Sequence, residues 1–212
     1  MDGLLLDTEP VYRSVSKAAA KEFGVSFSDE LFEKFIGRDQ ADVNIELKRE
    51  FGEHFSLANF RKIWNAHWEI EASGMRIKKK VGVEAMLAEL ERMQIPFAIA
   101  TSTHRERTKF LLSAAGLIQR FPIVVTGEDV QQGKPAPDIY SHAALKLEVL
   151  GESCVALEDS DSGVLAATAA DMLAIMVPDL KAPSDAAASA ASDIFRDLNE
   201  ARLVLAGLFE GA

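Results

Sequence analysis

Cysteine is almost absent from this chain, because Cys154 is the single one among 212 residues. One cysteine cannot form a disulfide within the chain, as is usual for cytoplasmic proteins, and we expect Cys154 to pack near the start of a buried strand. Long apolar runs are absent too, since no stretch approaches the roughly 18 residues of a membrane span. No basic residues precede the first leucines, which argues against a signal peptide. We therefore expect a cytoplasmic protein with no membrane partner.

Positive charge is scarce. The sequence has 23 Lys and Arg against 33 Asp and Glu, which gives a net charge of −10. This balance argues against nucleic acid or an anionic membrane as the main partner. A small anionic substrate stays possible if a cation and basic side chains gather at one site. The length suits one large domain, or a core domain with an insertion.

The first third of the chain has a helical pattern only. Apolar residues recur at steps of three and four from Val11 to Phe23, and Gly24 follows as a helix stop. Ser28 is a plausible N-cap for a short helix that ends before Gly37. Residues 41–51 and 57–72 give two more helical patterns. We predict a small all-helical domain over residues 11–76.

From Gly82 onward, short apolar runs alternate with helical patterns. The strand-like runs cover residues 96–100, 122–125, 154–157 and 173–177, and the helical patterns cover residues 83–93, 105–115, 137–150, 163–170 and 194–209. Because the strands are apolar throughout, both faces of the sheet should be covered by helices. We predict an α/β domain with a doubly wound parallel sheet, formed by residues 1–10 and 77–212.

Two adjacent acids, Glu158 and Asp159, end one of these apolar runs. Neighbouring carboxylates at the end of a buried strand cannot both point into a core without a partner. A hard divalent cation with oxygen ligands is a suitable partner, and open α/β sheets bind ligands beyond the ends of their strands. On their own, the two acids could also interact with the dipole of the following helix.

Three further polar segments fall at the same predicted edge of the sheet. They are Asp2-Gly3 at the chain start, Thr101-Ser102 after another apolar run, and Lys134 in a proline-containing loop. Carboxylates, oxyanion donors and an amine together suit phosphoryl transfer, in which catalysis is mostly positioning and charge neutralisation. Taken singly, Thr101-Ser102 could be a helix cap and Lys134 a solvated turn residue.

These four segments resemble, in order and spacing, the motifs of the haloacid dehalogenase-like superfamily of phosphotransferases. The likeness is strongest to the subgroup with a small helical cap inserted after the first motif, which holds sugar-phosphate phosphatases and β-phosphoglucomutases. It covers nearly the whole chain. The matching segments are Asp2-Gly3-Leu4-Leu5-Leu6-Asp7-Thr8-Glu9, Ala100-Thr101-Ser102, Lys134-Pro135 and Leu157-Glu158-Asp159-Ser160 with Gly163.

The resemblance implies a role for each matching residue. Asp2 would be the general acid and base, and its backbone carbonyl would contact the metal. Thr101, Ser102 and Gly3 would bind the transferring phosphoryl group, and Lys134 would neutralise the charge shared by phosphate and nucleophile. The implied cofactor is Mg²⁺, held by Asp2, Glu158 and Asp159.

The nucleophile of the family is an aspartate that would stand one position ahead of Met1. The strand that carries it, central in the family's sheet, would also precede Met1. We therefore expect no aspartyl-phosphate chemistry from the sequence as printed, because that intermediate needs the carboxylate. Two explanations stay open: the start is assigned at an internal methionine of a longer protein, or the chain is truncated and inactive.

The resemblance predicts a Mg²⁺-dependent phosphatase of small phosphorylated metabolites, sugar phosphates foremost, acting as a monomer or weak dimer. A β-phosphoglucomutase is the first alternative. Against it, Tyr12 stands where the mutases have a histidine, and Gln40 stands near the place of a cap arginine, although Arg38 is close by. A non-catalytic phosphate- or metal-binding protein is the second alternative.

Two other groups have a plainer interpretation. Lys78, Lys79 and Lys80 lie where the chain returns from the helical segment, and we expect a solvated hinge there, with attraction of anionic substrates as the alternative. Trp64 and Trp68 are four residues apart on one helical face, which is more typical of a core than of a ligand site.

Overall fold

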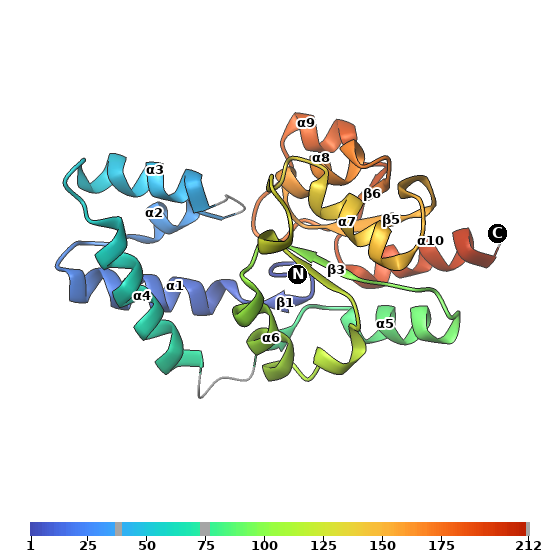
Figure 1. The fold of residues 1–212 in the computed structure, drawn as a ribbon, viewed down its shortest axis with the longest axis horizontal. Coiled ribbons are helices and arrows are strands. Elements are labelled where there is room, and N and C mark those ends of the chain that lie inside the picture. Colours follow the sequence, from blue (N-terminus) through green and yellow to red (C-terminus); the bar gives the residue numbers. More distant parts are fainter. Residues whose placement is uncertain (37–39, 73–76, 211–212) are drawn as a thin grey trace. The chain divides into compact units, whose positions relative to one another are not determined.

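The computed structural model describes residues 1–36, 40–72 and 77–210. The chain divides into two compact units (Figure 1). One consists of Met1–Asp7 with Ile77–Ala212, and the other of Thr8–Arg76. The assignment of the second unit as a cap domain stays a prediction.

The second unit is helical in the residues described. Its elements are α1 (Glu9–Phe23), α2 (Asp29–Glu33), α3 (Gln40–Phe51) and α4 (Leu57–Ala72). Gly24 adopts the left-handed conformation that ends α1, and the Ser28 hydroxyl accepts a hydrogen bond from the Leu31 amide at the start of α2. Trp64 and Trp68 stack on each other, and Tyr12 stacks on both. The expectation that the two tryptophans pack in a core is therefore confirmed.

The first unit alternates strands and helices, as expected for an α/β domain. After β1 (Leu6–Asp7) and β2 (Lys78–Lys79), the order is α5 (Val83–Arg92), β3 (Ile99–Thr101), α6 (Arg105–Ala114), β4 (Val124–Thr126), α7 (Asp138–Leu147), β5 (Val155–Glu158), α8 (Asp161–Ala169), β6 (Leu173–Met176), α9 (Asp185–Ala190), β7 (Asp193–Ile194) and α10 (Leu198–Glu210). In Figure 1, α7 and α8 lie on one side of the strands, and α5 and α10 on the other. The doubly wound α/β class is confirmed.

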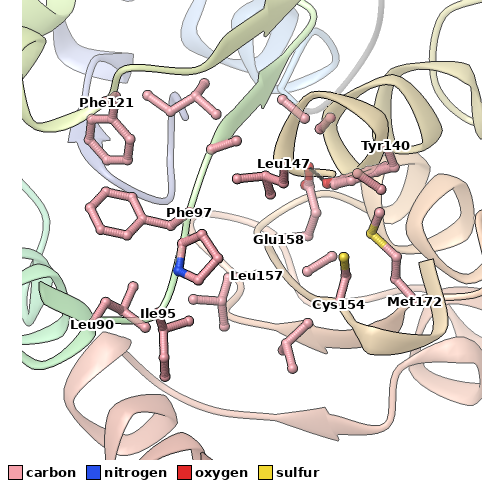
Figure 2. Close-up of a pocket in the computed structure, with 18 of the residues that line it drawn as sticks. Leu90, Ile95, Phe97, Phe121, Tyr140, Leu147, Cys154, Leu157, Glu158 and Met172 are labelled. Atoms are coloured by element: carbon pink, nitrogen blue, oxygen red, sulfur yellow. Dashed lines mark hydrogen bonds between the residues drawn. The ribbon is translucent and has the colours of Figure 1, made fainter. Parts of the chain in front are cut away.

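The strands of this unit pair in parallel, but they form two separate sheets. One sheet has the order β3-β4 and the other β5-β6-β7, while the short strands β1 and β2 pair antiparallel. The parallel pairing expected from the sequence is therefore confirmed, within two sheets. Residues of both β3 and β5 line a cavity in this unit (Figure 2).

Two predicted elements have different limits in the structure. The strand expected over residues 96–100 is reduced to Ile99–Thr101, because β4 offers partners only in the register that pairs Ile99 with Val124 and Thr101 with Thr126. The last helix was expected to begin at residue 194, but Ile194 pairs with Met176 in β7. Asp197 then caps α10, since its carboxylate accepts hydrogen bonds from the Asn199 and Glu200 amides.

The interior of this unit is apolar and rich in alanine. Val164, Ala166 and Ala167 of α8 are fully buried in this core, where the helix packs against β5, β6 and α9. The segment 182–192, which the sequence left unassigned, contains the short helix α9, capped by the Ser184 hydroxyl. None of the helices in the described ranges combines the length and apolar character that crossing a membrane requires.

Candidate active site

The carboxyl ends of β3 and β5 meet at Lys134. Its ammonium donates to the carbonyl oxygen of Ala100 in β3 at 3.3 Å, and it forms an ion pair with the Glu158 carboxylate at the end of β5. Both side chains of this pair are less than 10% exposed. Lys134 is therefore a buried cation between two strand ends, and the plainer interpretation of a solvated turn lysine is wrong.

The Glu158 carboxylate is held by partners on both of its oxygens. Oε1 accepts a hydrogen bond from the Tyr140 hydroxyl at 2.5 Å, and Oε2 accepts from the Ser160 hydroxyl at 2.9 Å and from the backbone amides of Asp159 and Ser160 at 3.2 Å. Gly163 is required beside it, because a Cβ at this position would overlap the carboxyl group. The Gly163 in the fourth motif thus makes room for Glu158.

The groups around Glu158 keep its carboxylate ionised. Burial alone would raise its pKa, but the Lys134 charge, the N-terminal ammonium and the hydrogen bonds from Lys134 and Tyr140 lower the pKa of Glu158 to about 2. The pKa of Tyr140 is raised well above its usual value, first by burial and then by the charge of Glu158. Glu158 is therefore an anion at neutral pH, and Tyr140 is its permanent donor.

Asp159 has the opposite electrostatic character. Burial and the neighbouring charge of Glu158 raise the pKa of Asp159 to about 7, against the opposing effects of the N-terminal ammonium and Lys134. The Asp159 carboxylate packs against Gly3, which has a positive φ of 73° and leaves no space for a Cβ. A buried carboxylate with a raised pKa gains from a nearby cation.

The first residues of the chain form a tight loop against this carboxylate. The Met1 carbonyl accepts hydrogen bonds from the Leu5 and Leu6 amides, and the Gly3 amide donates to Leu6. Asp2 is thereby directed to the loop after β3, where its carboxylate accepts a hydrogen bond from the Thr103 hydroxyl at 2.8 Å. In that loop the Thr101 hydroxyl accepts from the Thr103 amide at 3.2 Å. The loops at residues 2–3 and 101–103 are thus joined directly.

Asp179, in the loop after β6, adds another carboxylate beside Gly3. One of its oxygens lies 3.2 Å from the position that a Gly3 Cβ would take, next to Asp159. Its other oxygen forms an ion pair with the Lys80 ammonium at 2.5 Å, and the Asp179 side chain is only 8% exposed. Lys80 is therefore a partner of the site and not part of a solvated hinge. Lys78 and Lys79 form β2, which also departs from the predicted hinge.

The structure gathers most of the predicted site residues. Gly3 contacts Asp159, Asp2 contacts the loop that holds Thr101 and Ser102, and Lys134 pairs with Glu158. Thr101 is buried and its hydroxyl accepts a bond within its own loop, while His104 is the N-cap of α6, so the plainer interpretation of Thr101-Ser102 as a helix cap is wrong. The roles of these residues in binding and catalysis stay predictions.

A divalent cation was predicted at Asp2, Glu158 and Asp159. Within the part of the chain that the structure describes, no group of three or more His, Cys, Asp or Glu side chains is arranged to hold a metal ion. The Glu158 carboxylate is turned toward Lys134 and Tyr140. Asp159 does fit a hard cation, because burial and the charge of Glu158 raise its pKa and a bound cation would offset both effects. One or two carboxylates with waters are also how proteins usually hold Mg²⁺.

Sequence reasoning missed Tyr140, Thr103 and Asp179. Tyr140 lies six residues after Lys134, and only the packing of α7 against β3 and β4 directs its hydroxyl to Glu158. Thr103 is the third of three consecutive hydroxyl residues, and no local pattern distinguishes it from Thr101 and Ser102. Asp179 follows β6, so its position after a third strand was a usable signal for a site at this sheet edge.

An α/β domain with charged loops gathered at its strand ends is a common design for an enzyme, and comparison with known proteins identifies the family. Residues 1–177 match the family model described as haloacid dehalogenase-like hydrolase. The chain therefore belongs to the haloacid dehalogenase-like hydrolase family, as the motifs predicted.

Relatives and solved structures agree with this assignment. The chain is 32% identical over 170 residues to "Phosphorylated carbohydrates phosphatase" of Thermotoga maritima, covering 80% of this chain and 78% of that protein. It is 33% identical over 185 residues to "(DL)-glycerol-3-phosphatase 2" of Arabidopsis thaliana, covering 84% and 77%. A crystal structure from Thermotoga maritima, provisionally named beta-phosphoglucomutase, superimposes with a TM-score of 0.79 and 30% identity over 97% of this chain and 95% of that one.

Proposed function

We propose that this protein is a Mg²⁺-dependent phosphatase of small phosphorylated metabolites, sugar phosphates foremost, which acts through an aspartyl-phosphate. The observation that carries the proposal is the convergence of Asp2, Lys134, Glu158 and Asp159 from separate segments at the ends of β3 and β5. The names of the Thermotoga and Arabidopsis relatives support a phosphorylated carbohydrate or polyol as substrate class.

In this proposal, each residue acts on the phosphate through its own chemistry. The Asp2 carboxylate, held by the Thr103 hydroxyl, gives a proton to the leaving oxygen and later takes one from the attacking water. The Thr101 hydroxyl and the amides of Ser102 and Gly3 bind the phosphoryl oxygens. Lys134 neutralises charge between phosphate and nucleophile, while Glu158 keeps it in position.

Mg²⁺ is assigned to Asp159 and the backbone carbonyl of Asp2, with Glu158 as a further predicted ligand. When bound, the ion would neutralise charge on the phosphoryl group and orient it. Asp159 contributes an anionic oxygen once its proton is lost, and its pKa of about 7 leaves the residue half ionised near neutral pH.

The nucleophile is the part that residues 1–212 do not supply, since the resemblance places it one position ahead of Met1. We therefore expect the 212-residue polypeptide to leave p-nitrophenyl phosphate unhydrolysed with or without Mg²⁺. An extension that ends in aspartate directly before Met1 should restore hydrolysis that requires Mg²⁺ and is lost with EDTA.

The matched control is the same extension ending in asparagine, which keeps the length and loses the carboxylate. Equal hydrolysis by the aspartate and asparagine forms would contradict the proposed nucleophile. Binding of Mg²⁺ or phosphate by the aspartate form, with no turnover of any phosphate ester, would favour a non-catalytic binding protein.

A phosphosugar mutase is the second candidate, favoured by the name of the similar Thermotoga structure. Tyr12, which stands where the resemblance places the mutase histidine, stacks on both indoles of the second unit and does not offer an imidazole. Arg38 lies outside the described residues, as does the side chain of Gln40. Conversion of β-glucose 1-phosphate to glucose 6-phosphate by the aspartate-extended chain, with a bisphosphate primer, would replace the phosphatase proposal by the mutase.

A further inference from the structure

Lys80 holds two segments of the first unit through different parts of the residue. Its backbone amide donates to the carbonyl oxygen of Leu5 at 2.9 Å, directly after the strand pair β1-β2. Its ammonium forms the ion pair with Asp179, which lies 99 residues further along the chain. One residue thus joins the loop at residues 1–5 to the loop after β6.

The surroundings of this ion pair make it more than a surface contact. The Asp179 side chain is 8% exposed and the Lys80 side chain 29%. A carboxylate that is largely withdrawn from water is costly unless a cation or hydrogen bonds compensate it. We therefore expect the Asp179 carboxylate to keep its place only while the Lys80 ammonium is beside it.

The backbone that carries Asp179 is anchored as well. At the start of the loop after β6, the Val177 amide donates to the carbonyl oxygen of Glu158 at 2.7 Å. At its end, the Ser184 amide donates to the Asp161 carboxylate at 3.2 Å. Both ends of the loop are therefore attached to the segment that begins with Glu158, so the ion pair fixes a side chain on a backbone that is already held.

Gly3 lies beside two carboxylates. One oxygen of Asp159 and one of Asp179 are both within 3.2 Å of the point that a Gly3 Cβ would occupy. The φ of Gly3 is 73°, in the left-handed region that favours glycine. Its nitrogen belongs to the same planar peptide as the Asp2 carbonyl. The contacts of Gly3 therefore also determine where that carbonyl points.

We propose that Lys80 and Asp179 are positioning residues of the cation site. The Lys80 ammonium holds the Asp179 carboxylate against Gly3, and the Lys80 amide holds the end of the same loop. Together they keep the Asp2 carbonyl in place relative to the Asp159 carboxylate. The inference rests on the proposed function, because it takes that carbonyl and that carboxylate as ligands of Mg²⁺. Neither Lys80 nor Asp179 has to contact the ion.

The charge of Lys80 gives the test a clear sign. If Lys80 acted through its charge alone, its removal would strengthen Mg²⁺ binding, because like charges repel. Loss of a positioning residue acts in the opposite direction, and outer-shell changes of this kind cost roughly 10–100-fold in metal affinity. The Lys80→Met chain should therefore bind Mg²⁺ about tenfold or more weakly than the unchanged 212-residue chain, in isothermal titration calorimetry at pH 8. Equal or tighter binding would overturn the proposal.

Two further variants separate positioning from general stability. Lys79→Met removes a neighbouring charge whose partner Glu84 is 58% exposed, and it should change the dissociation constant by less than about twofold. Lys80→Met combined with Asp179→Leu replaces the ion pair by apolar side chains, which often restores stability. Its melting temperature should recover toward that of the unchanged chain, while its Mg²⁺ binding stays weak. Recovery of full Mg²⁺ affinity in this double variant would show that the pair serves stability only, and would overturn the proposal.

The hold on the loop can also be measured without metal. The amides of Leu5 and Leu6 donate to the Met1 carbonyl within the loop at residues 1–5 and at its end. Their hydrogen exchange, followed by NMR, should quicken by about tenfold or more in Lys80→Met. The amide of Leu117, which donates to Leu112 in another part of the unit, is the internal control and should not change. Unchanged exchange at Leu5 and Leu6 would contradict the hold on the loop and overturn the proposal.

Failure of this inference differs from failure of the proposed function. If Asp159→Asn abolishes Mg²⁺ binding while Lys80→Met leaves it intact, the positioning role is wrong and the cation site stands. If the unchanged chain binds no Mg²⁺, or Asp159→Asn binds it equally tightly, the proposed cation site is wrong and the positioning role is overturned with it.

Discussion

At the scale of single residues, the main feature of the site is the contrast between two adjacent acids. Successive side chains of a strand point to opposite faces, so Glu158 meets Lys134 and Tyr140 while Asp159 meets Gly3. One carboxylate is thereby fully compensated, and the other keeps a raised pKa of about 7. The pair thus holds a fixed anion and a group that gains from a cation side by side.

The first prediction concerns the Asp159→Asn variant without added metal. The folded chain holds the Asp159 proton more tightly than the unfolded chain, in which the pKa of this carboxyl lies near 3.8. The stabilisation that the protonated Asp159 gives to the folded chain is therefore full below pH 3.8 and is lost as the pH rises through 7. The melting temperature of Asp159→Asn minus that of the unchanged chain should grow from pH 5 to pH 8.

Asp129 provides the control for this measurement, because hydrogen bonds from Thr126 lower its pKa and its contribution is lost only as the pH falls below 3.8. The difference for Asp129→Asn should stay constant between pH 5 and pH 8. A flat difference for Asp159→Asn as well would contradict the raised pKa.

The second prediction concerns Gly163→Ala. A Cβ at this position overlaps the Glu158 carboxyl group, which cannot move without breaking its bonds to Lys134 and Tyr140. We expect a loss of about 1–3 kcal/mol in the free energy of unfolding, measured by urea denaturation. Gly207→Ala is the matched helical control, since its Cβ would meet no atom within 4 Å, and it should be neutral or stabilising by up to about 1 kcal/mol.

The third prediction concerns the ion pair of Lys80 and Asp179. Lys80→Met leaves the Asp179 carboxylate, only 8% exposed, without its cation and should cost about 2 kcal/mol or more of unfolding free energy. Lys79→Met is the control, because its partner Glu84 is 58% exposed, and it should cost under about 1 kcal/mol. Equal effects of the two substitutions would show that the Lys80 pair contributes no more than a surface pair.

At the scale of elements, the ends of strands and helices decide more than their interiors. The loops after β3, β5 and β6 bring Thr103, Asp159 and Asp179 to the loop at residues 1–5. Helix starts are fixed by side-chain caps, as with Ser160 at α8, whose hydroxyl accepts from the Gly163 amide. The Ser160 hydroxyl also donates to the Glu158 carboxylate, so one side chain serves both the helix cap and the site.

The fourth prediction concerns the start of α10. Asp197 accepts hydrogen bonds from the Asn199 and Glu200 amides at 2.8 and 3.2 Å. Asp197→Ala should therefore cost about 1 kcal/mol of unfolding free energy in a urea titration. Asp193→Ala, an exposed residue of β7, should change it by less than about 0.5 kcal/mol. Equal changes in unfolding free energy for the two variants would show that the Asp197 cap does not determine where α10 begins.

At the scale of the whole molecule, the excess of negative charge bears on how the site binds its ligands. The net charge of −10 repels phosphate in general. A phosphate site on this chain therefore depends on local positive charge, supplied by Lys134 and by the proposed Mg²⁺ ion.

The fifth prediction is that Mg²⁺ stabilises the fold. Saturation at about 100 times the dissociation constant adds roughly 2.7 kcal/mol, which corresponds to a rise of about 5–10 °C in melting temperature for a chain of this size. Thermal unfolding at pH 8 should show this rise with MgCl₂ and not with NaCl of equal ionic strength. The Asp159→Asn variant should lose it, and a full rise in that variant would exclude Asp159 as a ligand.

The sequence by itself determined the class of the fold and which segments gather at the candidate site. Continuous apolar strands such as residues 154–157 require helices on both faces, and acids at a strand end require a partner. Both properties are local, so periodicity and spacing reveal them without a structure. The order and spacing of the four motifs were enough to identify the family.

Only the tertiary structure decided which partners these residues have. The hydroxyl of Tyr140 on Glu158, the ion pair of Lys80 with Asp179 and the division of the parallel strands into two sheets all join segments distant in sequence. Such contacts depend on how helices pack on strands and on whether a strand edge finds a neighbour. No local pattern records that choice, because each side chain has the same propensities with either set of partners.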